Sequence, residues 1–378
     1  MLVPGSAAEA ARRPARRPRG PGAPSDPAAS RPAYLGTYTS RPGGGAGIGL
    51  ASYLPGTGEI AATGVIGGIA NPSYLALSPS RRMLYAVGEQ AEGTVTALRL
   101  RADGPPEPLG SRSTGGADPC HLSVHPGGRF LLSANYTGGS IAVHPIGRDG
   151  SLGAATDVVR HRGSGPDPER QGAPHAHMVI SDPAGRYVLA VDLGTDTVHT
   201  YCLDDRKGIL RERGRVATRP GAGPRHLAFH PSGKYAYLVN ELDSTLVVCG
   251  YEPRTGRLEP GAPQATLPSA VRLGERNYPA GVVVSADGRF VYVSNRGHDS
   301  IAAFAVRLGG AGLRLLGVTP SGGAYPRHIA FDGTGTLLFA ANQKSGCVST
   351  FRVDCRTGRL ARVNAALAVP AAACVLPL

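Results

Sequence analysis

Residues 227–241 read LAFHPSGKYAYLVNE: an apolar run, a turn containing Pro and Gly, a second apolar run and a polar end. Two short apolar runs joined by such a turn are typical of a β-hairpin. The same phrase recurs at 75–89, 122–136, 178–193, 282–296 and 329–343. Aligned on the third turn residue, successive copies lie 47, 57, 48, 55 and 47 residues apart. The chain is therefore an internal repeat.

A second pair of strands follows each hairpin. It is a run of small and β-branched residues, a turn and another strand, as in STLVVCGYEPRTGRLEP (244–260) and GCVSTFRVDCRTGRLAR (346–362). A further version, GIGLASYLPGTGEI (47–60), precedes the first full copy. Four strands per unit at a spacing of about 50 residues predict a β-propeller with one blade per unit.

The two ends of the repeat region complement each other. YLGTYT (34–39) matches the second strand of a hairpin that lacks its first strand, and VPAAACVLPL (369–378) matches a first strand. We therefore predict an all-β fold over residues 34–378: a seven-bladed β-propeller whose last blade joins one C-terminal strand to three N-terminal strands. Such closure removes the exposed sheet edges that favour aggregation.

Residues 1–33 differ from the rest of the chain. They include RRPARRPRGPGAPSDPAASRP (12–32), which carries almost no bulky apolar residues. A segment of this composition cannot bury enough surface to offset the entropy of ordering, so we expect a disordered extension or a misassigned start codon. Its prolines interrupt the apolar region that an export signal requires. No stretch of 18 apolar residues occurs anywhere, which excludes a transmembrane helix.

The net charge is +13, and only three of the 40 basic residues are lysines. An excess of Arg, Ala, Gly and Pro is common in proteins from GC-rich genomes, and no nucleic-acid-binding motif accompanies it. We expect no nucleic-acid or membrane partner, but a basic surface that attracts a small anionic substrate. The six cysteines form no CxxC pair, so we expect a reducing, cytoplasmic location. We also expect a monomer.

In each hairpin, the start of the first strand and the end of the second strand meet at one rim of the propeller. The first-strand starts carry Tyr74, His121, His175, His177, Arg225, His226, Arg327 and His328. The second-strand ends carry Glu89, Asn135, Tyr136, Asp192, Asn240, Glu241, Asn295, Arg296, Asn342 and Gln343, and a following loop adds His298 and Asp299. One rim therefore gathers histidines, arginines and carboxylates.

The repeat separates structural from functional candidates. Asn135, Asn240, Asn295 and Asn342 recur at one position, which indicates a turn-stabilising role. Arg225, Glu241 and Arg296 occur only in some blades, which favours function. His226 and His328 share one repeat position, and both interpretations remain open for them. We interpret His125, His161 and His230 as structural.

His175 and His177 form an HxH pair whose side chains would share one face of a strand. Such a pair could bind a metal ion, but no spacing supplies a third ligand. No phosphate-binding Walker loop and no G-x-S-x-G motif occur. We therefore expect no metal and no cofactor.

Four phrases carry a family resemblance: APHAHMVISDPAGRYVLAVDLGTD (173–196), GPRHLAFHPSGKYAYLVNELDSTL (223–246), YPAGVVVSADGRFVYVSNRGHDSIAAF (278–304) and YPRHIAFDGTGTLLFAANQ (325–343). They resemble the seven-bladed lactonase family, which includes bacterial 6-phosphogluconolactonases and fungal carboxy-muconate lactonising enzymes. The resemblance implies that His177, Arg225, Glu241 and Arg296 are catalytic. We expect six further rim side chains to bind substrate: His175, His226, His298, Arg327, His328 and Gln343.

The resulting hypothesis is a lactone hydrolase that opens a small anionic sugar lactone, with 6-phosphogluconolactone as the expected substrate. Glu241 or His177 would be the base, and the sequence does not decide between them. Arg225 and Arg296 would hold the phosphate or carboxylate and the developing oxyanion. Two alternatives remain: a muconate-type lactonising cycloisomerase, and a propeller that only binds a partner.

Overall fold

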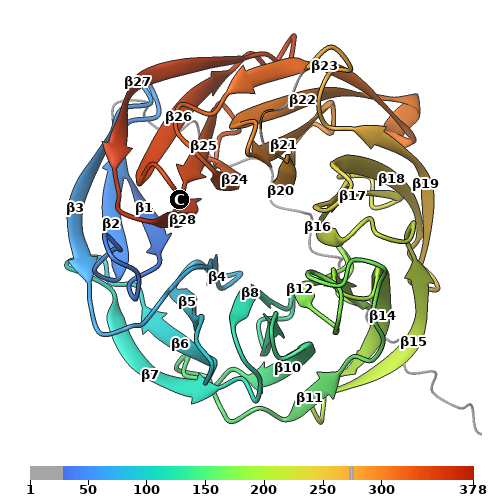
Figure 1. The fold of residues 1–378 in the computed structure, drawn as a ribbon. Helices are drawn as coiled ribbons and strands as arrows, with labels where there is room; N and C mark the ends of the chain where they lie inside the picture. The colour runs from blue at the N-terminus through green and yellow to red at the C-terminus, as the bar shows by residue number, and fades with distance from the viewer. Residues whose placement is uncertain (1–28, 272–273, 275) are drawn as a thin grey trace, which may run out of the picture.

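The computed structural model describes residues 29–271, 274 and 276–378. They form seven four-stranded antiparallel sheets arranged as blades around a central axis (Figure 1), which confirms the all-β, seven-bladed propeller. Residues 1–28, for which we expect a disordered extension, lie outside the described residues. In the part of the chain that is described, no helix has the length and apolar character needed to cross a membrane.

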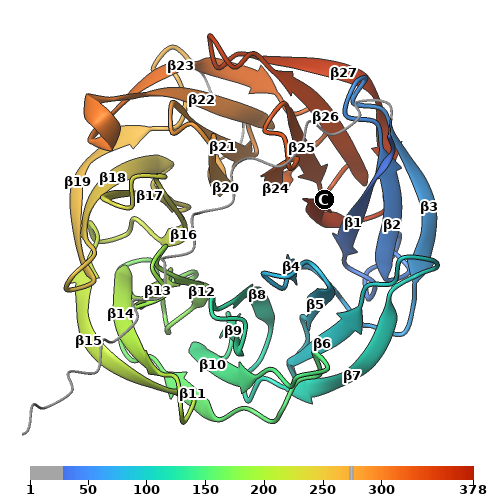
Figure 2. The ribbon, with the colours of Figure 1, turned by 180° about the vertical axis from the view of Figure 1, so that it is seen from behind.

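Each blade has the same strand order from the axis outwards. Figure 2 shows the ring from the opposite side. The innermost strands are β28 (Ala372–Pro377), β4 (Leu75–Leu77), β8 (Pro119–Val124), β12 (Ala176–Ser181), β16 (Pro224–Phe229), β20 (Tyr278–Val284) and β24 (Pro326–Phe331). The second strands are β1 (Arg31–Thr37), β5 (Met83–Gly88), β9 (Phe130–Asn135), β13 (Val188–Asp192), β17 (Tyr235–Asn240), β21 (Phe290–Arg296) and β25 (Leu337–Asn342).

The third strands are β2 (Ile48–Tyr53), β6 (Thr94–Arg99), β10 (Ser140–Pro145), β14 (Thr197–Asp204), β18 (Thr245–Glu252), β22 (Ser300–Arg307) and β26 (Cys347–Val353). The outermost strands are β3 (Ile60–Ile66), β7 (Glu107–Ser113), β11 (Asp157–Arg160), β15 (Ile209–Ala217), β19 (Arg257–Ala265), β23 (Gly312–Pro320) and β27 (Leu360–Ala368). A single 3₁₀ turn, η1 (Leu308–Gly310), lies between β22 and β23 among the described residues.

The ring closes as predicted, because β28 pairs with β1 and completes the sheet β28-β1-β2-β3. However, β1 begins at Arg31, which pairs with Tyr53, so the propeller starts three residues before the boundary expected at 34. Pro32 also accepts a hydrogen bond from the backbone of Leu378 at 3.0 Å. These first residues join the sheet through backbone pairing and lack the apolar alternation that marks a strand in the sequence.

The hydrophobic core lies between neighbouring blades. Tyr85 of β5, for example, packs with Leu122 and Leu131 of the next blade, and its hydroxyl donates to the carbonyl of Gly150 at 3.1 Å. The same link joins Tyr237 to Gly310 and Tyr292 to Gly358. A buried tyrosine of this kind contributes a large apolar area while its polar end stays hydrogen-bonded. At these three places, a buried tyrosine of the repeat thus joins one blade to the next.

The recurring asparagines stabilise the blades, as expected. The amide of Asn135 donates to the carbonyl of Thr114 at 3.4 Å and to Ser140 Oγ at 3.0 Å, and so ties the incoming loop to the third strand. The equivalent contacts join Asn295 to Thr266 and Ser300, and Asn342 to Ser321 and Ser349. These side chains are buried, and their contacts are structural.

Candidate functional site

In four of the blades, a β-bulge in the first strand presents one side chain at the rim. In the blades that begin with β8, β12, β16 and β24, the unpaired residue is Cys120, His177, Arg225 and Arg327, respectively. An extra residue in one strand bends it and re-aims the side chain. His177, Arg225 and Arg327 therefore occupy one structural position in three blades.

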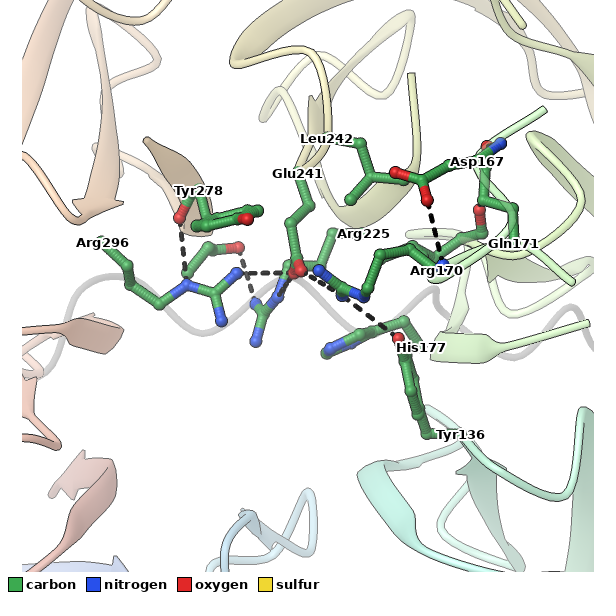
Figure 3. Close-up of polar contacts among 12 residues, drawn as sticks. Tyr136, Asp167, Arg170, Gln171, His177, Arg225, Glu241, Leu242, Tyr278 and Arg296 are labelled. Atoms are coloured by element: carbon green, nitrogen blue, oxygen red, sulfur yellow. Dashed lines mark hydrogen bonds and ion pairs between the residues drawn. The ribbon is translucent and has the colours of Figure 1, made fainter. Parts of the chain in front are cut away.

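The end of the second strand supplies the partners of these side chains. Glu241 follows β17 directly, and its backbone N–H donates to the carbonyl of Gly223 at 2.7 Å, which fixes the turn. Arg296 is the last residue of β21 in the next blade. Figure 3 shows that Glu241, Arg225 and Arg296 converge, with His177 beside them.

The carboxylate of Glu241 is buried and contacts the guanidinium groups of three arginines. We call Glu241, Arg170, Arg225 and Arg296 the arginine cluster. Its Oε2 lies 3.0 Å from Nε of Arg225 and 2.5 Å from Nη2 of Arg296. Its Oε1 lies 2.6 Å from Nη2 of Arg170. Three positive charges therefore surround one negative charge.

Backbone carbonyls and Tyr136 hold these arginines in place. Arg225 Nη1 donates to the carbonyl of Ala280 at 2.8 Å, and Arg296 Nε donates to that of Tyr278 at 3.0 Å. Arg170 Nη2 also donates to the hydroxyl of Tyr136 at 3.2 Å. The guanidinium groups are thus oriented before any substrate binds, which lowers the cost of stabilising negative charge.

The charge state of the arginine cluster follows from burial and from its neighbours. Burial alone would raise the pKa of Glu241, but the guanidinium groups of Arg296, Arg225 and Arg170 outweigh it and hold that pKa far below its usual range. Burial and the adjacent Arg296 lower the pKa of Arg225 to about 9, which is still above neutral pH. At neutral pH, Glu241 is therefore a carboxylate and Arg225 stays charged.

His177 lies at the side of this cluster and is 4% exposed. Its ring meets Tyr136 edge-on at 5.5 Å between centroids and His226 at 5.2 Å. Burial, and then the charge of Arg225, lower the pKa of His177 well below its ordinary value. The imidazole is therefore neutral at pH 7 and can accept a proton.

Below this position, aromatic rings fill the propeller axis. Tyr74 packs against His121 at 4.4 Å and against His328 at 5.4 Å, and His121 meets His226 at 5.5 Å. The Nδ1 atoms of His121 and His328 each accept a hydrogen bond from a backbone N–H of the next blade. Burial lowers their pKa values to about 3 and about 4. His226 and His328 thus belong to the floor of the site.

The remaining expected substrate-binding residues do not all reach the arginine cluster. His175 stacks on Tyr136 at 4.5 Å, and its Nδ1 contacts the Tyr136 carbonyl at 3.0 Å. His298 contacts Ser300 Oγ at 2.8 Å and, within the described residues, has no hydrogen bond or ion pair with Glu241. Among the described residues, the buried Oε1 of Gln343 has no hydrogen-bond partner.

Contrary to the prediction from the HxH spacing, His175 and His177 do not lie together in a regular strand. His175 precedes β12, which begins at Ala176, and a bulge follows at once. The described residues do contain one close group of metal-ligand types: His161, Asp192 and His199. Here His161 Nδ1 lies 2.6 Å from Asp192 Oδ2, and the two imidazoles stack at 4.1 Å and 24°. Stacked rings direct their nitrogen lone pairs in parallel, which does not suit a shared ion.

Arg170 is the main site residue that the repeat did not reveal. It lies between β11 and β12, on a loop that no other blade matches. The signal was the interval of 57 residues between the second and third copies, which is longer than its neighbours. The other long interval carries Arg276, whose Nη2 donates to the Leu242 carbonyl at 2.7 Å and whose Nη1 lies 3.9 Å from Asp167. The two inserted loops therefore meet beside Glu241.

The chain is similar to known proteins over almost its whole length. The sequence profile of the family described as "Lactonase, 7-bladed beta-propeller" matches residues 32–377. A 6-phosphogluconolactonase from Bacillus subtilis is 36% identical over 90% of this chain and 97% of its own length. Another 6-phosphogluconolactonase, from Formosa agariphila, is 31% identical over 89% of this chain and 96% of its own.

A solved structure is similar over the same range. The periplasmic gluconolactonase of Pseudomonas aeruginosa superimposes with a TM-score of 0.86 at 30% identity. The match covers 93% of this chain and 99% of that protein. The similarity therefore extends over every blade.

Proposed function

This chain belongs to the seven-bladed β-propeller lactonases, and we propose that it hydrolyses 6-phosphogluconolactone to 6-phosphogluconate. The arginine cluster supports this function most strongly, because Arg170, Arg225 and Arg296 surround the single carboxylate of Glu241. Three positive charges and one negative charge leave a local excess of two. A phosphate group, which carries about −1.5 to −2 charges at neutral pH, matches that excess.

The three arginines differ in how open they are. The side chain of Arg170 is 32% exposed, whereas those of Arg225 and Arg296 are 2% and 5% exposed. We assign Arg170 to the phosphate, because only an open guanidinium can take a large hydrated anion. Arg225 and Arg296 lie deeper and would stabilise the oxyanion that forms on the lactone carbonyl.

His177 is our candidate for the general base. A neutral imidazole accepts a proton from water while the water oxygen bonds to the lactone carbonyl carbon. When the tetrahedral intermediate collapses, the bond from that carbon to the ring oxygen breaks, and His177 returns the proton to the ring oxygen. The products are the open acid and a regenerated neutral imidazole.

Glu241 supports the reaction in another way. Both of its carboxylate oxygens contact guanidinium groups, which also hold its pKa far below the usual range, so the carboxylate is not free to accept a proton from water. We therefore propose that Glu241 orients the arginines. Cys120 lies 3.7 Å from His177 Nδ1, but burial raises the pKa of its thiol, so it is not a nucleophile at neutral pH.

We also propose a cytoplasmic location, which the cysteines support. All six lie within the described residues and are unpaired, as is usual in a reducing compartment.

Turnover assays test the function. Purified protein is mixed with 6-phosphogluconolactone, and acid release is followed against spontaneous hydrolysis; a carboxylated muconate is the second substrate. We expect acceleration of lactone hydrolysis only. Cyclisation of the muconate without lactone hydrolysis would replace our proposal with a cycloisomerase, and inactivity on both would favour a binding platform.

A further inference from the structure

A second carboxylate lies at the rim, in the position that corresponds to Glu241. Glu89 follows β5 just as Glu241 follows β17. Both of its oxygens accept from the hydroxyl of Tyr38, at 2.9 and 2.8 Å, and Oε2 also accepts from Ser73 Oγ. Arg327 Nη2 lies 3.8 Å from Oε2, and its guanidinium group covers the Tyr38 ring at 5.4 Å. We call Tyr38, Ser73, Glu89 and Arg327 the distal cluster.

Asn71 holds the distal cluster rigidly. Its Oδ1 accepts from the backbone N–H groups of Thr39 and Ser40 at 2.8 and 3.0 Å. Its Nδ2 donates to the carbonyl of Glu89 at 2.9 Å. Asn71 is buried and has a φ of 45°, in the left-handed region. One side chain thus fixes the two segments that carry Tyr38 and Glu89.

The distal cluster lies across the propeller axis from the arginine cluster. Glu89 belongs to the blade of β4–β7 and Glu241 to that of β16–β19, which face each other in Figures 1 and 2. Both carboxylates follow the second strand of their blade, so both lie at the same rim. The aromatic floor of Tyr74, His121, His226 and His328 lies on the axis between them.

The distal cluster has unused hydrogen-bonding capacity. A carboxylate offers about four acceptor positions, and Tyr38 and Ser73 occupy only part of them. The guanidinium group of Arg327 has five N–H donors and, among the described residues, makes no hydrogen bond within 3.5 Å. The side chains of Glu89 and Arg327 are 15% and 16% exposed, so they remain open to a ligand.

The charges of the distal cluster indicate what that ligand group is. Glu89 repels an anion, Arg327 repels a cation, and together they are neutral. A hydroxyl group both donates and accepts, so it can satisfy the carboxylate and the guanidinium group at the same time. We propose that the distal cluster is a hydroxyl-binding subsite that recognises the polyol part of a sugar lactone while the arginine cluster holds the charged part.

This inference rests on the proposed function for the identity of the substrate. It explains how the protein would select a sugar lactone over a lactone without hydroxyl groups. A ligand that lacks hydroxyls would desolvate Glu89 and Arg327 without filling their remaining hydrogen-bonding positions, and sites built for hydrogen bonding reject such ligands strongly.

Isothermal titration tests the subsite without requiring turnover. The two probes are 6-phosphogluconate and 6-phosphohexanoate, which share both charged ends and differ in the hydroxyl groups. We expect wild-type protein to bind 6-phosphogluconate roughly 10- to 100-fold more tightly, as hydrogen bonds to charged groups allow. Glu89→Gln and Arg327→Met should each reduce that ratio to below about threefold.

Glu92→Gln is the matched control, because Glu92 is exposed and three residues away in the chain; it should keep the wild-type ratio. If Glu89→Gln does not fold, Arg327→Met decides. Equal weakening of both probes, or a wild-type ratio near one, would overturn the subsite even if lactone hydrolysis is found. Selective binding without turnover would instead retain the subsite and refute the proposed hydrolysis.

Discussion

One hairpin connects Arg225 to Glu241 and brings Nε of the arginine within 3.0 Å of Oε2 of the glutamate. Both side chains are nearly inaccessible, with exposed fractions of 2% and 4%. The repeat predicts this contact, because the first strand begins and the second strand ends at the same rim. In a buried setting, each charge of such a pair depends on the other, and Glu241 is also the shared counter-ion of Arg170 and Arg296.

Glu241→Gln should therefore affect both stability and activity. Removing the carboxylate leaves three guanidinium groups without their shared counter-ion, and breaking a buried pair typically costs about 3–5 kcal/mol. We expect a lower melting temperature and a loss of kcat/KM of at least about 10²-fold. Glu259→Gln, at an exposed ion pair with Arg257, is the control and should change neither. A Glu241→Gln protein with wild-type stability and turnover would contradict the orienting role.

His177→Gln should reduce kcat by about 10²–10⁴-fold while the melting curve stays close to wild type. Because burial lowers the pKa of His177, its neutral, active form persists well below pH 6.5. In wild-type protein, kcat should stay level from pH 8 to below 6.5 and fall only under more acidic conditions. A kcat that halves near pH 6.5, or a His177→Gln variant with normal kcat, would remove His177 as the base.

The histidines of the floor should make the fold sensitive to acid. The pKa values of His121 and His328 are about 3 and about 4 in the folded protein and about 6.5 in the unfolded chain. Only the unfolded chain gains these protons as the pH falls from 6.5 towards 4, so stability is lost in that window. At pH 5 each histidine accounts for a loss of about 2 kcal/mol.

Urea unfolding at pH 7.5 and pH 5 measures this loss. His121→Gln should show a smaller difference between the two pH values than wild type, whereas replacing the half-buried His230 should not. Glu241 does not interfere, because its stabilising effect disappears only below the unfolded pKa of about 4.3. Equal unfolding free energies at the two pH values would refute the explanation.

Ring closure predicts that deleting the C-terminal segment destabilises the protein, whereas deleting the N-terminal segment does not. Deleting 369–378 removes β28, exposes the edge of β1 and takes Val369, Ala372 and Val375 from the core. We expect the melting temperature to fall by at least about 5 °C. Deleting 1–28 should leave melting and turnover unchanged, because that segment has few core-forming residues. An unchanged melting temperature after the C-terminal deletion would contradict closure through β28.

Much of this arrangement could be predicted from the sequence. The spacing of the hairpins predicts the blades and their closure, and residues that break the repeat mark Arg225, Glu241 and Arg296. Arg170 escapes this reasoning, because it lies on an inserted loop with no counterpart in another blade. The pattern also places Glu89 at a strand end, but its partners Tyr38 and Arg327 come from two other blades, which only the folded ring brings together.

The roles that we propose for the arginines differ from those expected from the sequence. From the sequence, Arg225 is an anion clamp, but its side chain is 2% exposed and is tied to Glu241 and to the Ala280 carbonyl. Arg170 is the open member of the cluster. The exposure of these arginine side chains depends on how the inserted loops cover the rim, and the repeat pattern does not predict it.

Phosphate binding by the arginine cluster is tested most directly by comparing two substrates, 6-phosphogluconolactone and glucono-δ-lactone. The quantity to measure is the ratio of their kcat/KM values in wild type and in Arg170→Met. Two charge-assisted hydrogen bonds to the phosphate predict a wild-type ratio of about 10² or more. Arg170→Met should lower it about tenfold, mainly through KM for the phosphorylated substrate, whereas the exposed control Arg219→Met should keep it. Equal kcat/KM on both lactones in wild type would contradict a phosphate-binding arginine cluster.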